Sequence, residues 1–261
     1  MVPGTIEFDH VTRKFGPKVA VAGLTLSNPP GELFAFLGPN GAGKTTTIKL
    51  LTGLLRPSSG TIRVCGHDTV AETCQATRFI GYVPDEAYLY DKLSGREFLE
   101  FVAQVRGFDR TQAAARIDRQ TEQFGLAEFL DDLAETYSHG MKQRLVFASA
   151  LLHDPAVLVV DEPMVGLDPK SVRLVKDLLR ARAAVGTTVF MSTHTLAVAE
   201  EIADRIGIID RGQLNFLGTQ QELQEALSLE QTSLEQLFLK LTAGDDGRPA
   251  EPRRSQSDRT P

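Results

Sequence analysis

The sequence of 261 residues contains no tryptophan, only two cysteines and no excess of basic residues. No CxxC or Cys/His spacing surrounds Cys65 or Cys74, so the sequence gives no sign of a metal cluster. Free thiols of a reducing compartment are favoured, although one disulfide between them stays open. The net charge is −6, whereas proteins that bind the phosphate backbone usually carry a strongly basic surface. We therefore expect no nucleic-acid partner.

Long hydrophobic runs are also missing. The strongest apolar stretches are only five or six residues long, at Leu33–Leu37, Leu50–Leu55 and Ala156–Val160, whereas a membrane-spanning helix needs roughly 20 residues. The first residues, Met1–His10, lack a basic segment followed by an apolar core, so no signal peptide is expected. The chain is predicted to be cytoplasmic and not to cross a membrane itself.

The remaining pattern predicts an α/β fold. Thr5–Phe8 and Val19–Leu26 alternate polar and apolar residues, which favours a small N-terminal antiparallel β subdomain. Leu33–Leu37 and Val157–Val160 are continuous apolar runs, as in strands that are buried on both faces. Because such runs alternate with helical patterns, we expect a mostly parallel sheet covered by helices. A helix is predicted from Lys44 to about Leu55.

A helical subdomain is predicted as an insertion at about 86–152. Its first helix has apolar residues at helical spacing, namely Phe98, Phe101, Val102 and Val105. A second helix is expected with a face of Ala114, Ile117, Thr121 and Phe124. The whole of 1–243 is interpreted as one domain, and 244–261, rich in charge and proline without aromatics, as a disordered tail.

One glycine-rich segment matches the pattern G-x-x-x-x-G-K-[ST]. It lies between an apolar strand and a helix, which is the context that a phosphate-binding P-loop requires. Glycines let backbone N–H groups approach phosphate oxygens, and the following helix N-terminus favours negative charge. The residues expected to bind ATP here are Gly38, Pro39, Asn40, Gly41, Ala42, Gly43, Lys44, Thr45 and Thr46. Lys44 should reach the β- and γ-phosphates, and the Thr45 hydroxyl should bind Mg²⁺.

A second motif follows the strand Val157–Val160, where Asp161 and Glu162 stand at its carboxyl end. Asp161 is expected to hold Mg²⁺, directly or through water. Glu162 can polarise a water molecule for in-line attack on the γ-phosphate. Two surface acids at the end of a strand are the alternative, which the P-loop earlier in the chain disfavours. The two motifs together predict a P-loop NTPase core.

With the segment Tyr137–Gln143, the chain resembles the nucleotide-binding subunits of ABC transporters over about residues 5–242. The order of motifs is theirs: Gly38–Thr45, Ser138–Gly140, Asp161–Glu162, Gly166–Asp168 and His194. The resemblance implies that Phe15 stacks on adenine, although a core position at a strand end is the alternative. It implies that Ser138 and Gly140 close over ATP held by a second subunit and that Asp168 bridges the subunits. His194 matches the histidine that contacts the γ-phosphate, so Lys44, Glu162 and His194 are the expected catalytic residues.

Several positions depart from the family pattern. Phe15 replaces the more frequent tyrosine and keeps the ring. Asp85 stands where glutamine is usual; it can still meet Mg²⁺ or water, but its charge changes the electrostatics of the metal site.

The segment Tyr137–Gln143 is called the signature segment. In it, His139 and Met141 replace the usual glycine and glutamine. No catalytic role is expected for either, because Met141 has helical spacing with Leu145, as in a core residue, and His139 is expected to be solvated.

The resemblance implies an ATPase that works through partners. Two ATP molecules would join two ATPase subunits, with a homodimer favoured over a heterodimer, and a separate transmembrane subunit would dock near Asp85–Arg106. The chain would then lie on the inner face of the membrane. Arg13–Gly16, Tyr137–Arg144 and Ser233–Phe238 look like bacterial exporter ATPases for drugs, lipids, sodium or polysaccharide. A soluble ABC-type ATPase that remodels ribosomes or nucleic-acid complexes is the alternative. An ATP-holding regulatory module and a small-molecule kinase fit the motifs less well.

Overall fold

The computed structural model describes residues 4–226, 234–236 and 238. The predicted tail at 244–261 lies outside this part of the chain. So does the segment Ser233–Phe238, except for four of its residues. Within it, no helix combines the length and the apolar character that crossing a bilayer requires. Cys65 is buried and Cys74 exposed, and both are free thiols.

The N-terminal strands form a sheet in the order β2-β1-β4-β5. β1 (Ile6–Phe15) pairs with β2 (Lys18–Asn28) and with β4 (Ser59–Val64), and β4 pairs with β5 (His67–Asp68), each time antiparallel. The predicted antiparallel subdomain is confirmed. Its first two strands are longer than the sequence indicated, because irregular register along the pair hides the strict alternation beyond Phe8.

The second sheet has the order β10-β9-β3-β8-β7-β6. The strands are β3 (Leu33–Leu37), β6 (Ile80–Val83), β7 (Val157–Asp161), β8 (Thr188–Thr193), β9 (Arg205–Asp210) and β10 (Gln213–Gly218). All neighbouring pairs are parallel except β9 with β10. This confirms the mostly parallel sheet, and it places the carboxyl ends of β3 and β7 at one edge.

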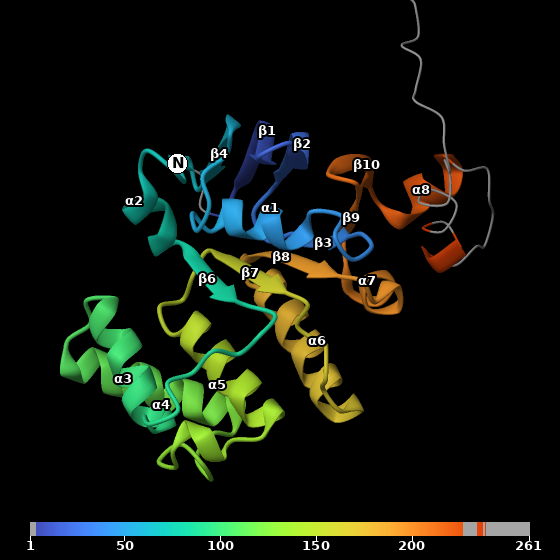
Figure 1. Cartoon of the computed structure of the whole chain (residues 1–261). Helices are drawn as coiled ribbons and strands as arrows, with labels where there is room; N and C mark the ends of the chain where they lie inside the picture. The colour runs from blue at the N-terminus through green and yellow to red at the C-terminus, as the bar shows by residue number, and fades with distance from the viewer. Residues whose placement is uncertain (1–3, 227–233, 237, 239–261) are drawn as a thin grey trace, which may run out of the picture.

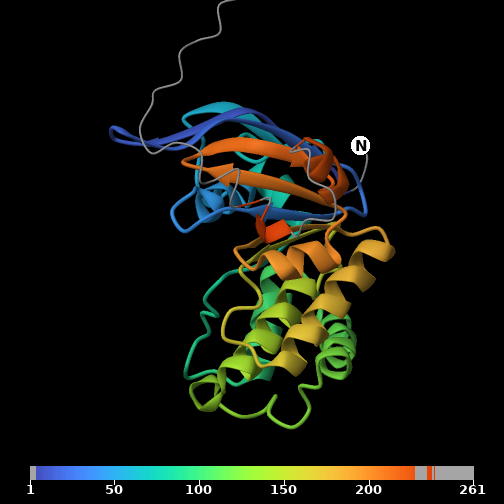
Figure 2. The same cartoon turned by 90° about the vertical axis from the view of Figure 1, so that its right-hand side faces the viewer.

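The central strand β3 is buried on both faces. Phe34 and Phe36 pack with residues of the N-terminal sheet and with Ile48 of α1 (Lys44–Leu51). Leu33, Ala35 and Leu37 face the opposite side, where they meet the helices α5 (His139–Leu151), α6 (Pro169–Ala184) and α7 (Leu196–Ile202). Figure 2 shows these helices below the two sheets. The short helices α2 (Thr73–Arg78) and α8 (Gln220–Ala226) lie at the sides.

Three helices between β6 and β7 enclose a core of their own (Figure 1). They are α3 (Gly95–Val105), α4 (Arg110–Phe124) and α5, with a short turn of helix at Ala134–Thr136. α3 begins at a capping box, in which Ser94 and Glu97 satisfy each other's backbone N–H groups. The boundary of this subdomain at about 86–152 stays a prediction.

The predicted apolar face of α3 is only partly buried. Leu99 and Ala103 are fully buried, whereas Phe101 is 46% and Val105 70% exposed. Phe98 and Val102 are only partly buried, so the apolar stripe lies at the edge of the helix contact and continues onto the surface.

Two further predictions need correction. In α4 the buried residues are Ala113, Ile117 and Gln120. Ile117 agrees with the prediction, whereas Ala113 and Gln120 each lie one position before the predicted Ala114 and Thr121. Helix α1 ends at Leu51, about one turn before Leu55. There Gly53 has a φ of +74°, which the helical pattern alone did not reveal.

Candidate functional site

A cleft of about 520 Å³ opens where the P-loop follows β3. It brings together ten of the predicted residues: Phe15, Pro39, Asn40, Gly41, Gly43, Lys44, Thr45, Thr46, Asp85 and Glu162. Lys18 and Ala20 of β2 also line it, and the sequence did not single them out. Residues from four separate parts of the chain therefore face one space.

The P-loop is shaped by glycine. Gly41 and Gly43 have φ values of +81° and +116°, which side-chain-bearing residues rarely adopt. A Cβ on Gly38 would lie 2.4 Å from the Ile209 carbonyl oxygen, and so the loop also depends on close packing against β9. Helix α1 then begins at Lys44 without a side-chain cap. Its first N–H groups are available to an anion in the cleft.

Lys44 points back along this loop. Its ammonium group donates to the carbonyl oxygens of Gly38 (2.7 Å) and Pro39 (3.3 Å) and lies 3.4 Å from Glu162 Oε1. The side chain is only 6% exposed, although a lysine is almost never this buried without partners. The positive charge is thus held at the floor of the cleft.

Asp161 lies at the end of β7 and is fully buried. The Ser192 hydroxyl donates to its Oδ1, whereas its Oδ2 is buried without a hydrogen-bond partner. Burial raises the pKa of Asp161; the Ser192 hydrogen bond opposes this shift, and the charges of Asp85 and Glu162 add to it. A buried anionic oxygen with a free lone pair is destabilised unless a cation or donor approaches it.

The unpartnered Oδ2 of Asp161 is a suitable ligand for a divalent cation. A hydrogen bond from the Thr45 side chain also lowers the pKa of Asp161, so the Thr45 hydroxyl lies beside the carboxyl group. Among the described residues, no cluster of three or more His, Cys, Asp or Glu could hold a metal on its own. A hard cation would therefore take further oxygen ligands from water and substrate phosphates, as Mg²⁺ usually does.

Glu162 follows directly and bridges two catalytic candidates. Its Oε2 lies 2.8 Å from His194 Nδ1 and 3.2 Å from the His194 backbone nitrogen, while Oε1 faces Lys44. The backbone of Glu162 has a φ of +47°, a strained value for this residue type. Its N–H is held at 3.2 Å by both the carbonyl and the hydroxyl oxygen of Ser192. The Glu162 side chain lines the cleft, where its carboxylate can accept a proton.

Phe15 is at the end of β1 and is 44% exposed, so it is not a core residue. The Arg13 guanidinium lies 4.5 Å from its ring centroid and steadies the ring by a cation–π contact. An exposed aromatic ring at the rim of the cleft has room for a flat base.

Ser138, Gly140 and Asp168 are not in this cleft. Ser138 caps α5, accepting a hydrogen bond from the Met141 N–H at 3.3 Å. Asp168 caps α6, where hydrogen bonds from the Ser171 hydroxyl and from backbone N–H groups lower the pKa of its carboxyl. Figure 1 shows both helices on the other side of the main sheet from α1. One chain therefore does not place its signature segment over its own P-loop.

Two contacts escaped sequence reasoning. The Ser192 hydroxyl contacts both the Asp161 carboxylate and the Glu162 backbone N–H. The polar residues at the end of β8 are the sequence feature that could have indicated these contacts. His139 was expected to be solvated. It is exposed, but its Nε2 lies 3.2 Å from the Val165 carbonyl, so it links the signature segment to the loop before Asp168.

Comparison with known proteins identifies the family. The ABC transporter family matches residues 21–165. The daunorubicin/doxorubicin resistance ATP-binding protein DrrA of Streptomyces peucetius is 40% identical over 222 residues, 85% of this chain and 67% of the relative. The Nod factor export ATP-binding protein I of Paraburkholderia xenovorans (strain LB400) is 38% identical over 213 residues, covering 82% and 70%. A solved ATP-binding subunit of an ABC transporter superposes with a TM-score of 0.85 at 29% identity, covering 90% of this chain and 98% of that one.

The chain belongs to the ABC transporter family. It is an ATP-binding and ATP-hydrolysing subunit that powers a membrane transporter, and a ribosome- or nucleic-acid-remodelling ATPase is not favoured. Subunits of this kind form dimers and work with transmembrane partners.

Proposed function

We propose that this chain hydrolyses MgATP between two copies of itself and thereby drives an exporter from the inner face of a membrane. The observation that carries the proposal is the position of Glu162, whose two carboxylate oxygens face Lys44 and His194 beside the P-loop. The names of the relatives, which refer to drug resistance and to export, support an exporter.

In this proposal, the residues Gly38–Thr46 wrap the triphosphate and Phe15 stacks on the adenine ring. Lys44 balances the charge of the β- and γ-phosphates. Mg²⁺, where bound, neutralises developing charge on the phosphates and would be held by Thr45 and Asp161, with Asp85 directly or through water. The unpartnered Oδ2 of Asp161 supports this choice.

Glu162 acts as the general base. It accepts a proton from the water whose oxygen attacks the γ-phosphorus, while the bond to the bridging oxygen breaks and ADP leaves with that electron pair. His194 holds the Glu162 carboxylate through the 2.8 Å contact and reaches the γ-phosphate from the open side. Each role needs a carboxylate that stays oriented, and the Ser192 contacts to the Glu162 backbone supply that orientation.

The second subunit supplies Ser138 and Gly140. The exposed N-terminus of α5 can accept a γ-phosphate from outside, and Asp168 lies at the neighbouring N-terminus of α6. Because two identical surfaces exchange these residues, a symmetric homodimer satisfies both sites at once.

The transmembrane partner binds the surface around α3. Four large apolar side chains are exposed there: Tyr88 (78%), Tyr90 (60%), Phe101 (46%) and Val105 (70%). Tyr90 and Phe101 pack edge to face with ring centroids 6.1 Å apart. Exposed aromatic side chains grouped in this way are typical of interaction sites.

The test compares the parent chain with Glu162→Gln. ATP hydrolysis should fall by about 10²–10⁴-fold in the variant, the range that one general base supplies. The variant should also accumulate an ATP-dependent dimer, measured by light scattering at increasing ATP concentration. Glu128→Gln, which changes an exposed carboxylate outside the cleft, is the matched control. Hydrolysis by Glu162→Gln at the parent rate would contradict the assignment.

A further inference from the structure

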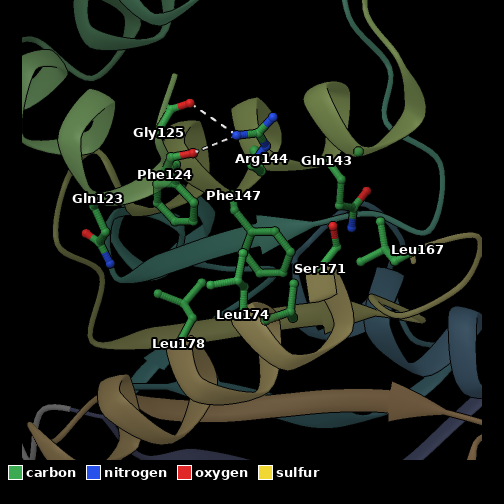
Figure 3. Close-up of a pocket in the computed structure, with 12 residues that line it drawn as sticks. Gln123, Phe124, Gly125, Gln143, Arg144, Phe147, Leu167, Ser171, Leu174 and Leu178 are labelled. Carbon is green, nitrogen blue, oxygen red and sulfur yellow. Dashed lines mark hydrogen bonds between the residues drawn. The ribbon is translucent and has the colours of Figure 1, made fainter. Parts of the chain in front are cut away.

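Residues of α4 and α6 line two adjoining cavities that the proposed hydrolysis mechanism does not use. The first cavity, of about 310 Å³, also borders α5, and the second has about 270 Å³. Gln123 of α4 and Leu178 of α6 line both, so the two cavities form one groove, called here the α4–α6 groove. Figure 3 shows these two side chains at one end of the first cavity. Neither cavity shares a lining residue with the P-loop cleft.

The first cavity of the groove is mainly apolar. The rings of Phe124 and Phe147 lie 6.3 Å apart and 20° from coplanar. Leu174 and Leu178 of α6 lie beside them, and Figure 3 shows the four side chains grouped together. Leu174 is 56% exposed, so an apolar side chain stands at the opening of the cavity. Such a wall favours the apolar part of a ligand.

The second cavity is basic. On α6, the spacing that joins Leu174 to Leu178 continues to Arg182, and on α4 Arg119 precedes Gln123 by the same four residues. Both arginines line the second cavity. Because residues four apart lie on the same face of a helix, the groove changes from apolar to cationic along both helices.

Arginines outnumber acids at this end of the groove. Arg116 Nη1 and Arg119 Nη2 donate to Asp154 Oδ2 at 2.9 and 2.7 Å. Arg182 Nη1 lies 3.8 Å from Asp154 Oδ1, which is too far for a hydrogen bond. Three guanidinium groups therefore share one carboxylate, and a net positive charge remains.

Arg182 is the cation that lacks a hydrogen bond. Its side chain is 17% exposed, and among the described residues its guanidinium makes only the long contact to Asp154. Burial lowers the pKa of Arg182; Asp154 opposes this shift, and the charge of Arg119 adds to it. A carboxylate could accept two hydrogen bonds from this partly desolvated group. Arg144, the cation of the first cavity, already donates to two backbone carbonyl oxygens.

We propose that the α4–α6 groove binds a single-chain aliphatic carboxylate, whose head bonds to Arg182 and whose chain lies against Leu178, Leu174 and Phe147. One arginine without a hydrogen bond matches a head with one negative charge. Between Leu174 and Arg182, α6 rises by roughly 12 Å, the length of a saturated chain of about eight to ten carbon atoms. The bound chain contacts both α4 and α6, and it leaves the ATP site free.

Octanoate is the probe, and octan-1-ol, which has the same chain and no charge, is its matched control. Binding to the full chain without nucleotide is followed by NMR through the methyl signals of Leu174 and of Val185, which lines the second cavity. Octanoate should bind about fivefold tighter than octan-1-ol, the factor expected of a partly exposed ion pair. Hexanoate should bind more weakly than octanoate, by up to about fourfold for each methylene removed.

Variants at the two ends of the groove separate the head from the chain. Arg182→Gln should weaken the binding of octanoate to the level of octan-1-ol and leave octan-1-ol unchanged. Arg173→Gln changes an arginine of α6 that is 84% exposed and outside the groove, and it should affect neither probe. Leu174→Asp should weaken both probes, whereas Leu54→Asp, at an exposed leucine elsewhere, should weaken neither.

Three results would overturn the proposal. The first is equal affinity of the parent chain for octanoate and octan-1-ol, a comparison that needs no variant and so does not depend on how Arg182→Gln folds. The second is an equal loss of both probes in Arg182→Gln, which would show that the arginine shapes the groove and does not bind the head. The third is methyl shifts of equal size at Leu54 and Leu174, which would indicate adsorption to exposed leucines.

Discussion

Asp85 provides the most informative perturbation, because its charge distinguishes this site from the family pattern. It lines the P-loop cleft with Lys44 and Glu162, and its charge helps to raise the pKa of Asp161. The side chain is exposed, so water screens it, and two unit charges about 4 Å apart in water interact by about 1 kcal/mol. Asp85→Asn is therefore expected to tighten the binding of ATP without Mg²⁺ by about fivefold.

The same variant tests the proposed metal role. If Asp85 holds Mg²⁺, Asp85→Asn raises the Mg²⁺ concentration needed for half-maximal hydrolysis, even though metal-free ATP binds more tightly. Nucleotide titrations with and without Mg²⁺, and hydrolysis rates across Mg²⁺ concentrations, separate the two effects. Glu86→Gln is the control, since this neighbouring exposed carboxylate bonds to Tyr88 and does not line the cleft.

Salt gives an internal check on this reasoning. The gain in metal-free affinity should shrink at 1 M salt, where the Debye length falls to about 3 Å. The Mg²⁺ requirement should change less, because a metal ligand acts at contact distance. If neither the metal-free affinity nor the Mg²⁺ requirement responds to Asp85→Asn, the assignment of Asp85 to the site is refuted.

Three other perturbations follow from the geometry. Phe15→Ala should weaken ATP binding by about 1–3 kcal/mol, whereas Phe15→Tyr should preserve it. Both affinities are measured by titration with a fluorescent nucleotide, and two variants that match the parent would exclude stacking. Gly140→Ala should keep the parent melting temperature, because a Cβ there meets nothing within 4 Å, but it should weaken ATP-dependent dimerisation. In Gly38→Ala the new Cβ would meet the Ile209 carbonyl at 2.4 Å. This variant should therefore lose about 1–3 kcal/mol of stability in denaturant unfolding. Asp161→Asn should raise the melting temperature at pH 7, because the pKa of Asp161 is raised in the folded state and its ionised carboxylate therefore destabilises the fold. This gain in melting temperature should vanish as the pH falls through the raised pKa toward 3.8, where the parent carboxyl becomes protonated. A melting temperature of Asp161→Asn that stays above the parent's by the same margin at every pH would show that charge is not the cause.

The parts of the site that the sequence predicted are local in the chain. The P-loop can be found because strand, glycines, lysine and helix follow one another within 33–51, and each element favours the next. The pair Asp161–Glu162 is found for the same reason. The contacts that orient these groups join distant residues: Ser192 holds Asp161 from 31 residues away, and His194 meets Glu162 across 32. No spacing rule reveals such pairs, because the sheet order decides them.

The exposure of part of the predicted α3 face has a different physical cause. Periodicity shows that Phe98, Phe101, Val102 and Val105 share a helix face, but it does not show what covers that face. Within this chain the helix packs through Leu99 and Ala103, and the two phenylalanines and two valines are left at the edge or in solvent. An apolar face that folding does not bury costs solubility, so its presence favours a surface that another chain covers. The exposed residues of this face thus support the proposed contact with the transmembrane partner.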